Sequence, residues 1–365
     1  MRFVDFFAGI GGIRLGLEQA GHKCVGFCEF DKYARTAYKA MYDTEGEWES
    51  HDVRANKPYD VPAADLWCFG FPCQDISVAG KQKGLQEGER SGLFYEIMRL
   101  LAGRRKEDRP KWLLIENVKN LLSIGNGFDF ARLLLEVGGD GYSIQWQVLN
   151  SKDFGVPQNR ERVFIVGYLG DIRGREVFPL RPADGENPCE LNEITKGVAD
   201  AQRIYDGSGL ARTLKGESGG QGGKTGLYAV RFRYTERGEK RQNGRRMKEP
   251  GEPSFTLTAQ DRHGVAIFDD QERKNKQLKP MDICPTLRAQ SHGNEPKVFG
   301  DNVRIRRLTP RECWRLQGFP DEYFDKAKAA GISDTQLYKQ AGNSVSVPVA
   351  KAIGESLKEV VDSHG

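Results

Sequence analysis

The strongest constraint in the sequence is an apolar run, residues 66–71, that ends at a proline followed by a cysteine. Proline has no N–H to donate and a fixed φ, so Pro72 ends the buried strand that this run predicts. Cys73 therefore follows the carboxyl end of a sheet strand, where open α/β proteins bind their ligands. A thiol there can act as a nucleophile; the alternative interpretation is a small buried hydrophobic side chain.

The next segment, residues 74–92, is polar and contains Gly80, Gly84, Gly88 and Gly92. It is too polar to belong to a core and long enough to act as a loop that closes over a site.

Length and composition bound the class of protein. A chain of 365 residues can form one large core and a second, smaller domain. The net charge is +4, so a nucleic-acid partner has to be argued from where the basic residues lie. Seven irregularly spaced cysteines fit neither a disulfide framework nor a zinc site, which predicts a reducing compartment and no metal. No apolar run approaches a membrane span and the first residues resemble a strand, so we expect a cytoplasmic protein.

Three predicted strands near the N-terminus end in residues suited to a nucleoside. The first, residues 3–7, runs into a glycine-rich turn and a helix from about Gly12, which allows a ligand to approach the backbone closely. The second ends at Glu29, where a ribose diol would be held, and the third ends at Asp52, where an adenine amino group would be bound. We interpret this pattern as a nucleoside-bearing cofactor site. An ordinary βα loop and a nicotinamide or flavin enzyme are the alternatives.

A further apolar run, residues 111–115, leads into Glu116. Its strand should neighbour that of Cys73, and a thiol beside a carboxyl group can form a nucleophile and general-acid pair; a helix-capping carboxylate is the alternative. Arg160 and Arg162 alternate with Glu161 before the strand at 163–168, so both should project to one side. They are candidates for contacts with phosphate or a base carbonyl.

In residues 171–302 the regular alternation of strand and helix patterns stops, and the sequence is polar and rich in glycine. Between positions 231 and 248 there are eight basic and two acidic residues, with Phe232 and Tyr234 interleaved. Basic side chains beside aromatic ones indicate a nucleic-acid surface, whereas a charge run without a partner is a solvated face. Short Thr-Leu segments repeat at 213, 256 and 286, and either present hydrogen-bonding edges to a groove or form ordinary hairpins.

Regular predicted secondary structure resumes near the C-terminus. A helix is predicted from Pro310, then a turn at Gly342–Asn343, then a final helix over 347–361 that packs on the sheet. The strand at 142–148 alternates apolar and polar residues and is predicted near the sheet edge. We therefore expect a doubly wound, mostly parallel α/β sheet with an inserted smaller, loop- and strand-rich domain. The boundaries are 1–170 for the catalytic and cofactor-binding domain, 171–302 for the insertion and 303–365 for the return segment.

Eight of these stretches occur in the order found in one family. They are DFFAGIGG from Asp5, the acidic residues around Glu29, Asp52, GFPCQ from Gly70, ENV from Glu116, QNRER from Gln158, LTPRECWRLQGFP from Leu308 and GNSV from Gly342. Together they resemble the prokaryotic DNA (cytosine-5) methyltransferases of restriction–modification systems. The resemblance implies a Rossmann-like, S-adenosylmethionine-dependent fold and makes residues 171–302 the target-recognition domain.

The resemblance also implies a reaction and a set of site residues. The substrate is a cytosine flipped out of duplex DNA and the cofactor is S-adenosylmethionine. The implied catalytic residues are Cys73, Glu116, Arg160 and Arg162. The implied cofactor-binding residues are Phe7, Gly9, Gly11, Glu29, Asp52, Pro72, Asn343 and Val345. The residues expected to contact DNA are Gln74, Ser77, Arg231, Arg233, Thr256, Arg262 and His263.

The same resemblance implies partners and leaves alternative functions to consider. We expect double-stranded DNA as partner, a restriction endonuclease that acts on the same site without an obligatory complex, and a monomer, because an asymmetric enzyme can modify each strand in turn. A tRNA cytosine methyltransferase and a catalytically silent DNA-binding relative are the alternatives. A nicotinamide oxidoreductase is rejected, since it leaves Cys73, Glu116 and Arg162 without a role.

Overall fold

The computed structural model describes residues 1–71, 92–180, 203–206, 210–216, 224–231, 268–269, 279–280 and 303–364, with single residues 191, 193 and 195. The chain divides into two compact units, Met1–Asn187 with Pro310–Gly365, and Pro188–Thr309. The composition of the sequence places these boundaries at 170 and 302 instead. Residues 171–180 belong to the first unit, and their side chains Val177 and Phe178 are buried in its core.

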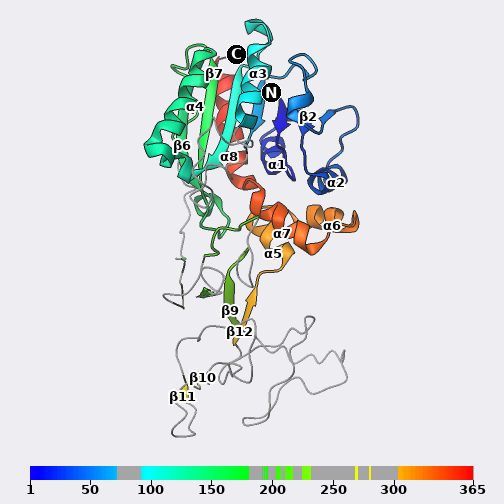
Figure 1. Cartoon of the computed structure of the whole chain (residues 1–365), viewed down its shortest axis with the longest axis vertical. Helices are drawn as coiled ribbons and strands as arrows, with labels where there is room; N and C mark the ends of the chain where they lie inside the picture. Colours follow the sequence, from blue (N-terminus) through cyan, green and yellow to red (C-terminus); the bar gives the residue numbers. More distant parts are fainter. Residues whose placement is uncertain are drawn as a thin grey trace. The chain divides into compact units, whose positions relative to one another are not determined.

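The first unit is built on a seven-stranded sheet with the order β3-β2-β1-β4-β5-β7-β6 (Figure 1). β7 is antiparallel to both of its neighbours, and the other neighbouring pairs are parallel. The predicted, mostly parallel α/β sheet is confirmed, and β6 is at the edge as its alternation indicated. The strands are β1 (Arg2–Phe6), β2 (Lys23–Cys28), β3 (Trp48–Ser50), β4 (Leu66–Phe69), β5 (Trp112–Val118), β6 (Tyr142–Asn150) and β7 (Glu161–Leu169).

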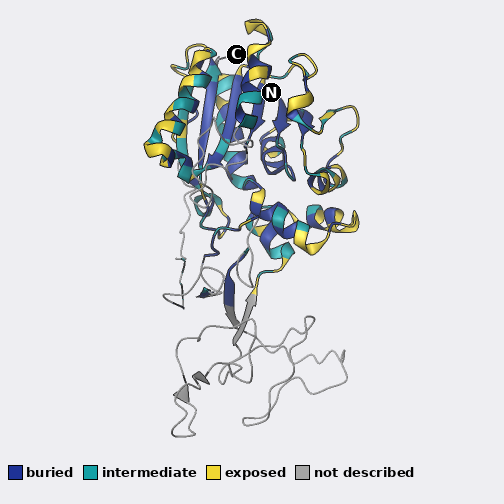
Figure 2. Cartoon of the chain, viewed as in Figure 1, coloured by how far each residue is buried: buried dark blue, intermediate teal, exposed yellow. Residues whose placement is uncertain are grey.

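Helices cover both faces of this sheet, and most residues of its central strands are buried, with all four residues of β4 among them (Figure 2). The apolar faces of α3 (Gly92–Ala102) and α4 (Phe128–Gly139) pack in one core cluster. Those of α1 (Gly12–Gln19) and α8 (Val347–His364) pack in the other. α2 (Lys32–Met41) lies against α6 (Asp321–Ala329). Short 3₁₀ turns are η1 (Val53–Ala55), η2 (Lys106–Asp108), η3 (Lys119–Leu122), η4 (Ile124–Gly127) and η5 (Ser151–Phe154).

The return segment forms α5 (Pro310–Leu316), α6, α7 (Asp334–Asn343) and α8. The start of α5 and the final helix agree with the sequence pattern. The turn predicted at Gly342–Asn343 is wrong, because both residues belong to α7. The N–H of Ser344 still donates to the carbonyl of Gln340 at 3.0 Å, so the helical hydrogen bonding continues through the glycine.

The second unit contains a three-stranded sheet with the order β12-β9-β8. Its strands are β8 (Ile204–Asp206), β9 (Leu227–Arg231) and β12 (Val303–Arg307), and β10 (Phe268–Asp269) pairs with β11 (Lys279–Pro280). Within the parts of the chain described here, no helix combines the length and apolar character needed to cross a membrane.

Candidate active site

The strand that leads to Cys73 lies beside the strand that carries Glu116. β4 and β5 are parallel neighbours, with Phe69 opposite Ile115. The buried Asn117 side chain donates from Nδ2 to the carbonyl of Phe71 at 3.3 Å, which anchors the last described residue before Pro72. The two strands therefore end together, as the sequence predicted.

Glu116 forms an ion pair with Arg162, with 3.2 Å between Oε1 and Nε. The two side chains are only 13% and 15% exposed, so water screens this pair weakly. The strand register explains the contact. Val118 of β5 lies opposite Arg162 of β7, and Glu116, two residues before Val118, is on the same face of β5 and so is a diagonal neighbour of Arg162. Burial raises the pKa of Glu116, and this effect exceeds the lowering by Arg162 and Arg160. A carboxyl group with a raised pKa is suited to donate a proton near neutral pH.

Arg160 is 2% exposed and points its guanidinium at backbone carbonyls. Nη2 donates to the carbonyl oxygens of Ser344 at 2.8 Å and Gly342 at 3.1 Å. Its backbone N–H donates to Oδ1 of Asn150 at 2.9 Å. Arg160 thus ties the start of β7 to the segment after α7, while Arg162 is the arginine paired with the candidate acid.

Gly70 leaves the space that the Glu116 carboxyl group occupies. A Cβ at position 70 would lie 3.0 Å from Oε2 of Glu116, closer than most Cβ contacts allow. We expect Gly70→Ala to lower kcat by roughly 10-fold to 10²-fold, because displacing the candidate acid Glu116 by a fraction of an ångström would disrupt its alignment. Steady-state kinetics with melting curves for both proteins measures the effect.

Gly138→Ala is the matched control for this change. A Cβ at that exposed position in α4 meets no atom within 4 Å. Alanine favours a helix over glycine by about 0.5–1 kcal/mol, so the melting temperature should rise slightly while kcat stays the same. An unchanged kcat in Gly70→Ala would show that the close approach to Glu116 has no catalytic importance.

The glycine-rich turn after β1 has the conformation that glycines permit. Gly9 and Gly11 have φ values of 56° and 75°, in the left-handed region. A Cβ at Gly9 would meet nothing within 4 Å, so the turn faces open space there. At Gly12 a Cβ would lie 2.3 Å from the carbonyl oxygen of Val345. The turn and the segment after α7 are thus in direct contact.

Glu29 lies beside this turn. Its carboxylate accepts from the backbone N–H of Gly9 and of Asp31, both at 2.7 Å. Burial raises the pKa of Glu29, while these two N–H groups lower it. The next side chain, Phe30, is 70% exposed. The sequence interpretation missed Phe30, although an aromatic residue directly after an acidic strand end was a visible signal.

Comparison with known proteins shows the family of the chain. The family model for the C-5 cytosine-specific DNA methylase matches residues 1–359. The chain belongs to this family. An orphan methyltransferase of Bacillus phage SPbeta, M.SPBetaI, is 32% identical, over 98% of this chain and 97% of the relative. The type II methyltransferase M.Bsp6I of Bacillus sp. (strain RFL6) is 33% identical, over 98% of both.

Two solved methyltransferase structures share the fold of this chain. The Entamoeba histolytica methyltransferase EhMeth matches with a TM-score of 0.61 at 17% identity, over 99% of this chain and 98% of that one. The S. pombe Dnmt2 methyltransferase matches with a TM-score of 0.60 at 16% identity, over 99% of both chains. At these identities the likeness concerns the fold alone.

The cofactor of this methylase is S-adenosylmethionine, and the residues around the turn fit it. Open space above Gly9, the Glu29 carboxylate and the exposed Phe30 ring lie at neighbouring strand ends. An exposed aromatic face can stack on adenine. Phe7, partly buried with a φ of 54°, begins the turn.

The other predicted cofactor residues of the methylase occupy different settings. Asp52 caps η1 and pairs with Arg54 at 2.8 Å, which holds the pKa of Asp52 below its ordinary value. Asn343 is exposed at the end of α7, and Val345 packs beside the core two residues later. Of the predicted cofactor residues, the structure therefore brings together those of the glycine-rich turn, Glu29 and the segment 343–345.

Several predicted site residues of the methylase lie outside the described residues. They are Pro72, Cys73, Gln74, Ser77, Arg233, Thr256, Arg262 and His263. Arg231 is the last residue of β9.

The cysteines that the structure describes do not compete with Cys73 for the role of nucleophile. Cys24, Cys28, Cys68 and Cys313 are all buried. Burial raises the pKa of Cys24 and Cys28 to about 12 and also raises that of Cys68. A thiol with a raised pKa forms little thiolate, so these positions suit packing.

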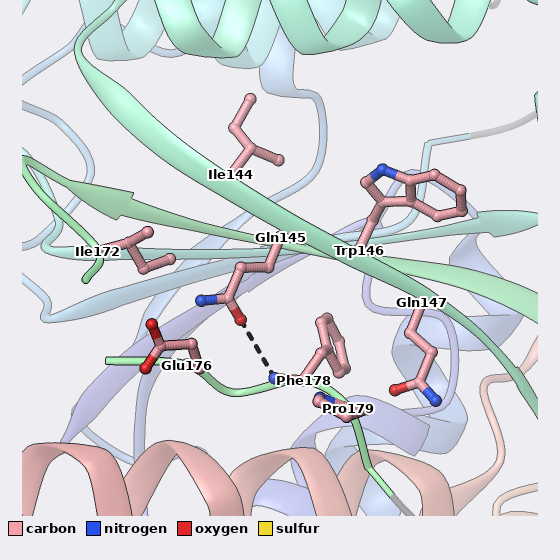
Figure 3. A pocket seen from close by; sticks show the side chains of 8 residues that line it. All are labelled: Ile144, Gln145, Trp146, Gln147, Ile172, Glu176, Phe178 and Pro179. Atoms are coloured by element: carbon pink, nitrogen blue, oxygen red, sulfur yellow. Dashed lines mark hydrogen bonds between the residues drawn. The ribbon is translucent and has the colours of Figure 1, made fainter. Parts of the chain in front are cut away.

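A surface hollow of about 560 Å³ beside β6 is lined by none of the predicted site residues (Figure 3). The Gln145 side chain there accepts from the N–H groups of Val177 and Phe178, and Gln147 accepts from that of Leu180. The polar groups that line the hollow thus hold residues 177–180 against the edge strand, which indicates packing.

Proposed function

We propose that the chain is a DNA (cytosine-5) methyltransferase that modifies a flipped-out cytosine in a short, specific duplex sequence through a covalent bond from Cys73 to carbon 6. The observation that carries this proposal is the buried Glu116–Arg162 pair at 3.2 Å, at the end of the strand next to the one leading to Cys73. Membership of the family supports the reaction type.

The chemistry explains why a thiol and an acid are both needed. Carbon 5 of cytosine is a poor nucleophile, and addition of the Cys73 thiolate to carbon 6 makes it enamine-like. A free thiol with a pKa near about 8.5 is only a few per cent ionised at neutral pH, so the site must favour the thiolate. Glu116 protonates the ring nitrogen or donates a strong hydrogen bond to it, as its raised pKa allows. Arg162 binds the base carbonyl.

Bound S-adenosylmethionine supplies an electrophilic methyl group to carbon 5. Loss of the carbon 5 proton to a base then returns the electron pair that expels Cys73 and restores the aromatic ring. Glu29 holds the cofactor ribose, Phe30 stacks on its adenine and Asp52 binds the adenine amino group. Extrusion of the base costs a few kcal/mol, which protein contacts have to offset. Contacts to DNA come from Gln74, Ser77, Arg231, Arg233, Thr256, Arg262 and His263.

Nucleoside mass spectrometry tests the proposal. The protein is incubated with S-adenosylmethionine and unmethylated plasmid, with parallel samples of genomic DNA and tRNA and with a Cys73→Ser variant. We expect 5-methylcytosine in DNA from the wild-type protein, and bisulfite sequencing then gives the target sequence. Product in tRNA alone would overturn the DNA assignment while preserving the chemistry. Product in none of the substrates would indicate a catalytically silent relative.

We propose further that the methylation protects DNA against a restriction endonuclease that recognises the same sequence, and that the enzyme acts as a monomer. The relatives named as type II and as orphan methyltransferases make both a paired and a solitary gene reasonable. Plasmid DNA modified by the protein should resist cleavage at the mapped sequence.

A further inference from the structure

Three segments far apart in the sequence meet at a buried group of polar side chains. The group consists of Ser151, Gln317 and Ser346, and we call it the polar junction. Ser151 begins η5 before β7, Gln317 follows α5 and Ser346 precedes α8. All three are buried, and Gln317 is 0% exposed. Buried polar groups are costly unless their hydrogen bonds are made, so such a junction specifies one arrangement of its segments.

The bonds within the polar junction form a chain. The Ser346 hydroxyl donates to Oε1 of Gln317 at 2.9 Å. Since a hydroxyl carries one proton, its 2.7 Å contact with the Ser151 hydroxyl is then a bond that Ser346 accepts. The Gln317 side chain donates from Nε2 to the carbonyl of Ala341 at 2.7 Å, and the backbone carbonyl of Gln317 accepts from the N–H of Val347 at 2.8 Å. Gln317 thus fixes the chain on both sides of residues 342–346.

One side of the polar junction reaches the base-binding residues. The N–H of Ser151 donates to the carbonyl of Arg160 at 3.0 Å. The Arg160 guanidinium in turn donates to the carbonyl of Ser344. Arg160 immediately precedes the strand that positions Arg162 against Glu116.

The other side reaches the cofactor turn. The backbone at Gly12 approaches Val345 so closely that a Cβ would lie 2.3 Å from its carbonyl and 2.6 Å from the hydroxyl oxygen of Ser344. Residues 344–346 therefore contact the turn through one face while the Ser346 hydroxyl is held in the polar junction. A change at the turn has to be accommodated by this segment, because both contacts are closely packed.

We propose that Ser346, held by Gln317, is a positioning residue that couples cofactor binding to the placement of Arg160 and Arg162. This inference rests on the proposed function. Cofactor bound against the turn holds residues 344–346 in one position, and the polar junction transmits that position to the start of β7. Coupling of two sites is reciprocal, so DNA bound at the catalytic side equally strengthens cofactor binding.

The test measures DNA affinity by fluorescence anisotropy without and with saturating S-adenosylhomocysteine. The DNA is a duplex carrying the sequence mapped by bisulfite sequencing. We expect the product to tighten wild-type binding by about 5-fold or more, within the range usual for coupled sites. In Ser346→Ala this ratio should fall towards one, because both bonds of the Ser346 hydroxyl are lost. Ser151→Ala deletes the Ser151–Ser346 bond alone and should lower the ratio as well.

Ser356→Ala is the matched control. It removes a hydroxyl from α8 that donates to the carbonyl of Val177 at 3.0 Å, away from both sites, and should leave the ratio at the wild-type value. A Ser346→Ala protein with a lower melting temperature but the wild-type ratio would show a purely structural role and overturn the proposal. A wild-type ratio of one would also overturn it. Neither outcome affects the proposed function, which the methylation of DNA by the wild-type protein tests separately.

Discussion

Cys73→Ser is expected to reduce methyl transfer by at least about 10⁴-fold, the scale at which removal of an enzymatic nucleophile acts. A serine hydroxyl is far less acidic than a thiol and adds poorly to carbon 6 of cytosine. Transfer of radiolabelled methyl groups to DNA measures the rate. With S-adenosylmethionine present, duplex DNA with 5-fluorocytosine at the target should trap the wild-type protein covalently, because after methyl transfer the fluorine cannot leave carbon 5 as a proton does. Cys73→Ser should form no such complex.

Cys68→Ala is the control for the loss of a thiol on the same chain segment. Cys68 lies on β4, is fully buried and has a raised pKa. Its replacement should cost about 1 kcal/mol in the free energy of unfolding and leave kcat near the wild-type value. Covalent trapping that persists in Cys73→Ser would assign the nucleophile to another residue.

Glu116→Gln is expected to lower kcat by about 10²-fold to 10⁴-fold, which is the usual contribution of a general acid. The amide keeps the shape of the side chain and an oxygen for Arg162, but its N–H groups are not acidic and cannot transfer a proton to the base. A general acid acts in its protonated form, and burial raises the pKa of Glu116. Wild-type kcat should therefore decrease as pH rises through this raised pKa. The variant should lose that dependence.

Glu161→Gln provides the comparison. Glu161 pairs with Lys119 at 2.8 Å, but its side chain is 45% exposed. Exposed pairs contribute about 0–1 kcal/mol, so kcat and its pH profile should stay close to those of the wild type. Binding of S-adenosylhomocysteine by calorimetry shows whether each variant retains a folded cofactor site. If Glu116→Gln kept kcat within a few-fold of wild type, another group would be the acid.

The strand ends of the first unit that carry the candidate site were largely predictable from the sequence. Apolar runs of four to six residues predicted β4 and β5, and parallel neighbours end on the same edge, so Cys73 and Glu116 were expected together. The glycine turn and Glu29 were found in the same way. The antiparallel direction of β7 could not be predicted, because the sequence pattern of an apolar strand is the same whether the strand is parallel or antiparallel to its neighbours.

Local patterns failed where distant segments decide the structure. Gly342 and Asn343 resemble a turn, but the helix continues through them because Ser344 still bonds to Gln340. Arg160 and Arg162 looked equivalent from their alternation. Their roles separate only because Arg160 meets the carbonyls of 342 and 344, almost two hundred positions away, while Arg162 faces Glu116 across the β5–β7 pairing.

The order and chemistry of residues along this chain were enough to indicate the family and its cofactor, and to select candidate residues for the reaction. These depend on side-chain type and on periodicity, which are local properties. The pairing of Glu116 with Arg162, the space beside Gly70 and the polar junction of Ser151, Gln317 and Ser346 required the folded chain. Each depends on the distance between atoms that are far apart in the sequence. Strand pairing within the sheet sets the first two distances, and packing of the return segment on the sheet sets those of the polar junction.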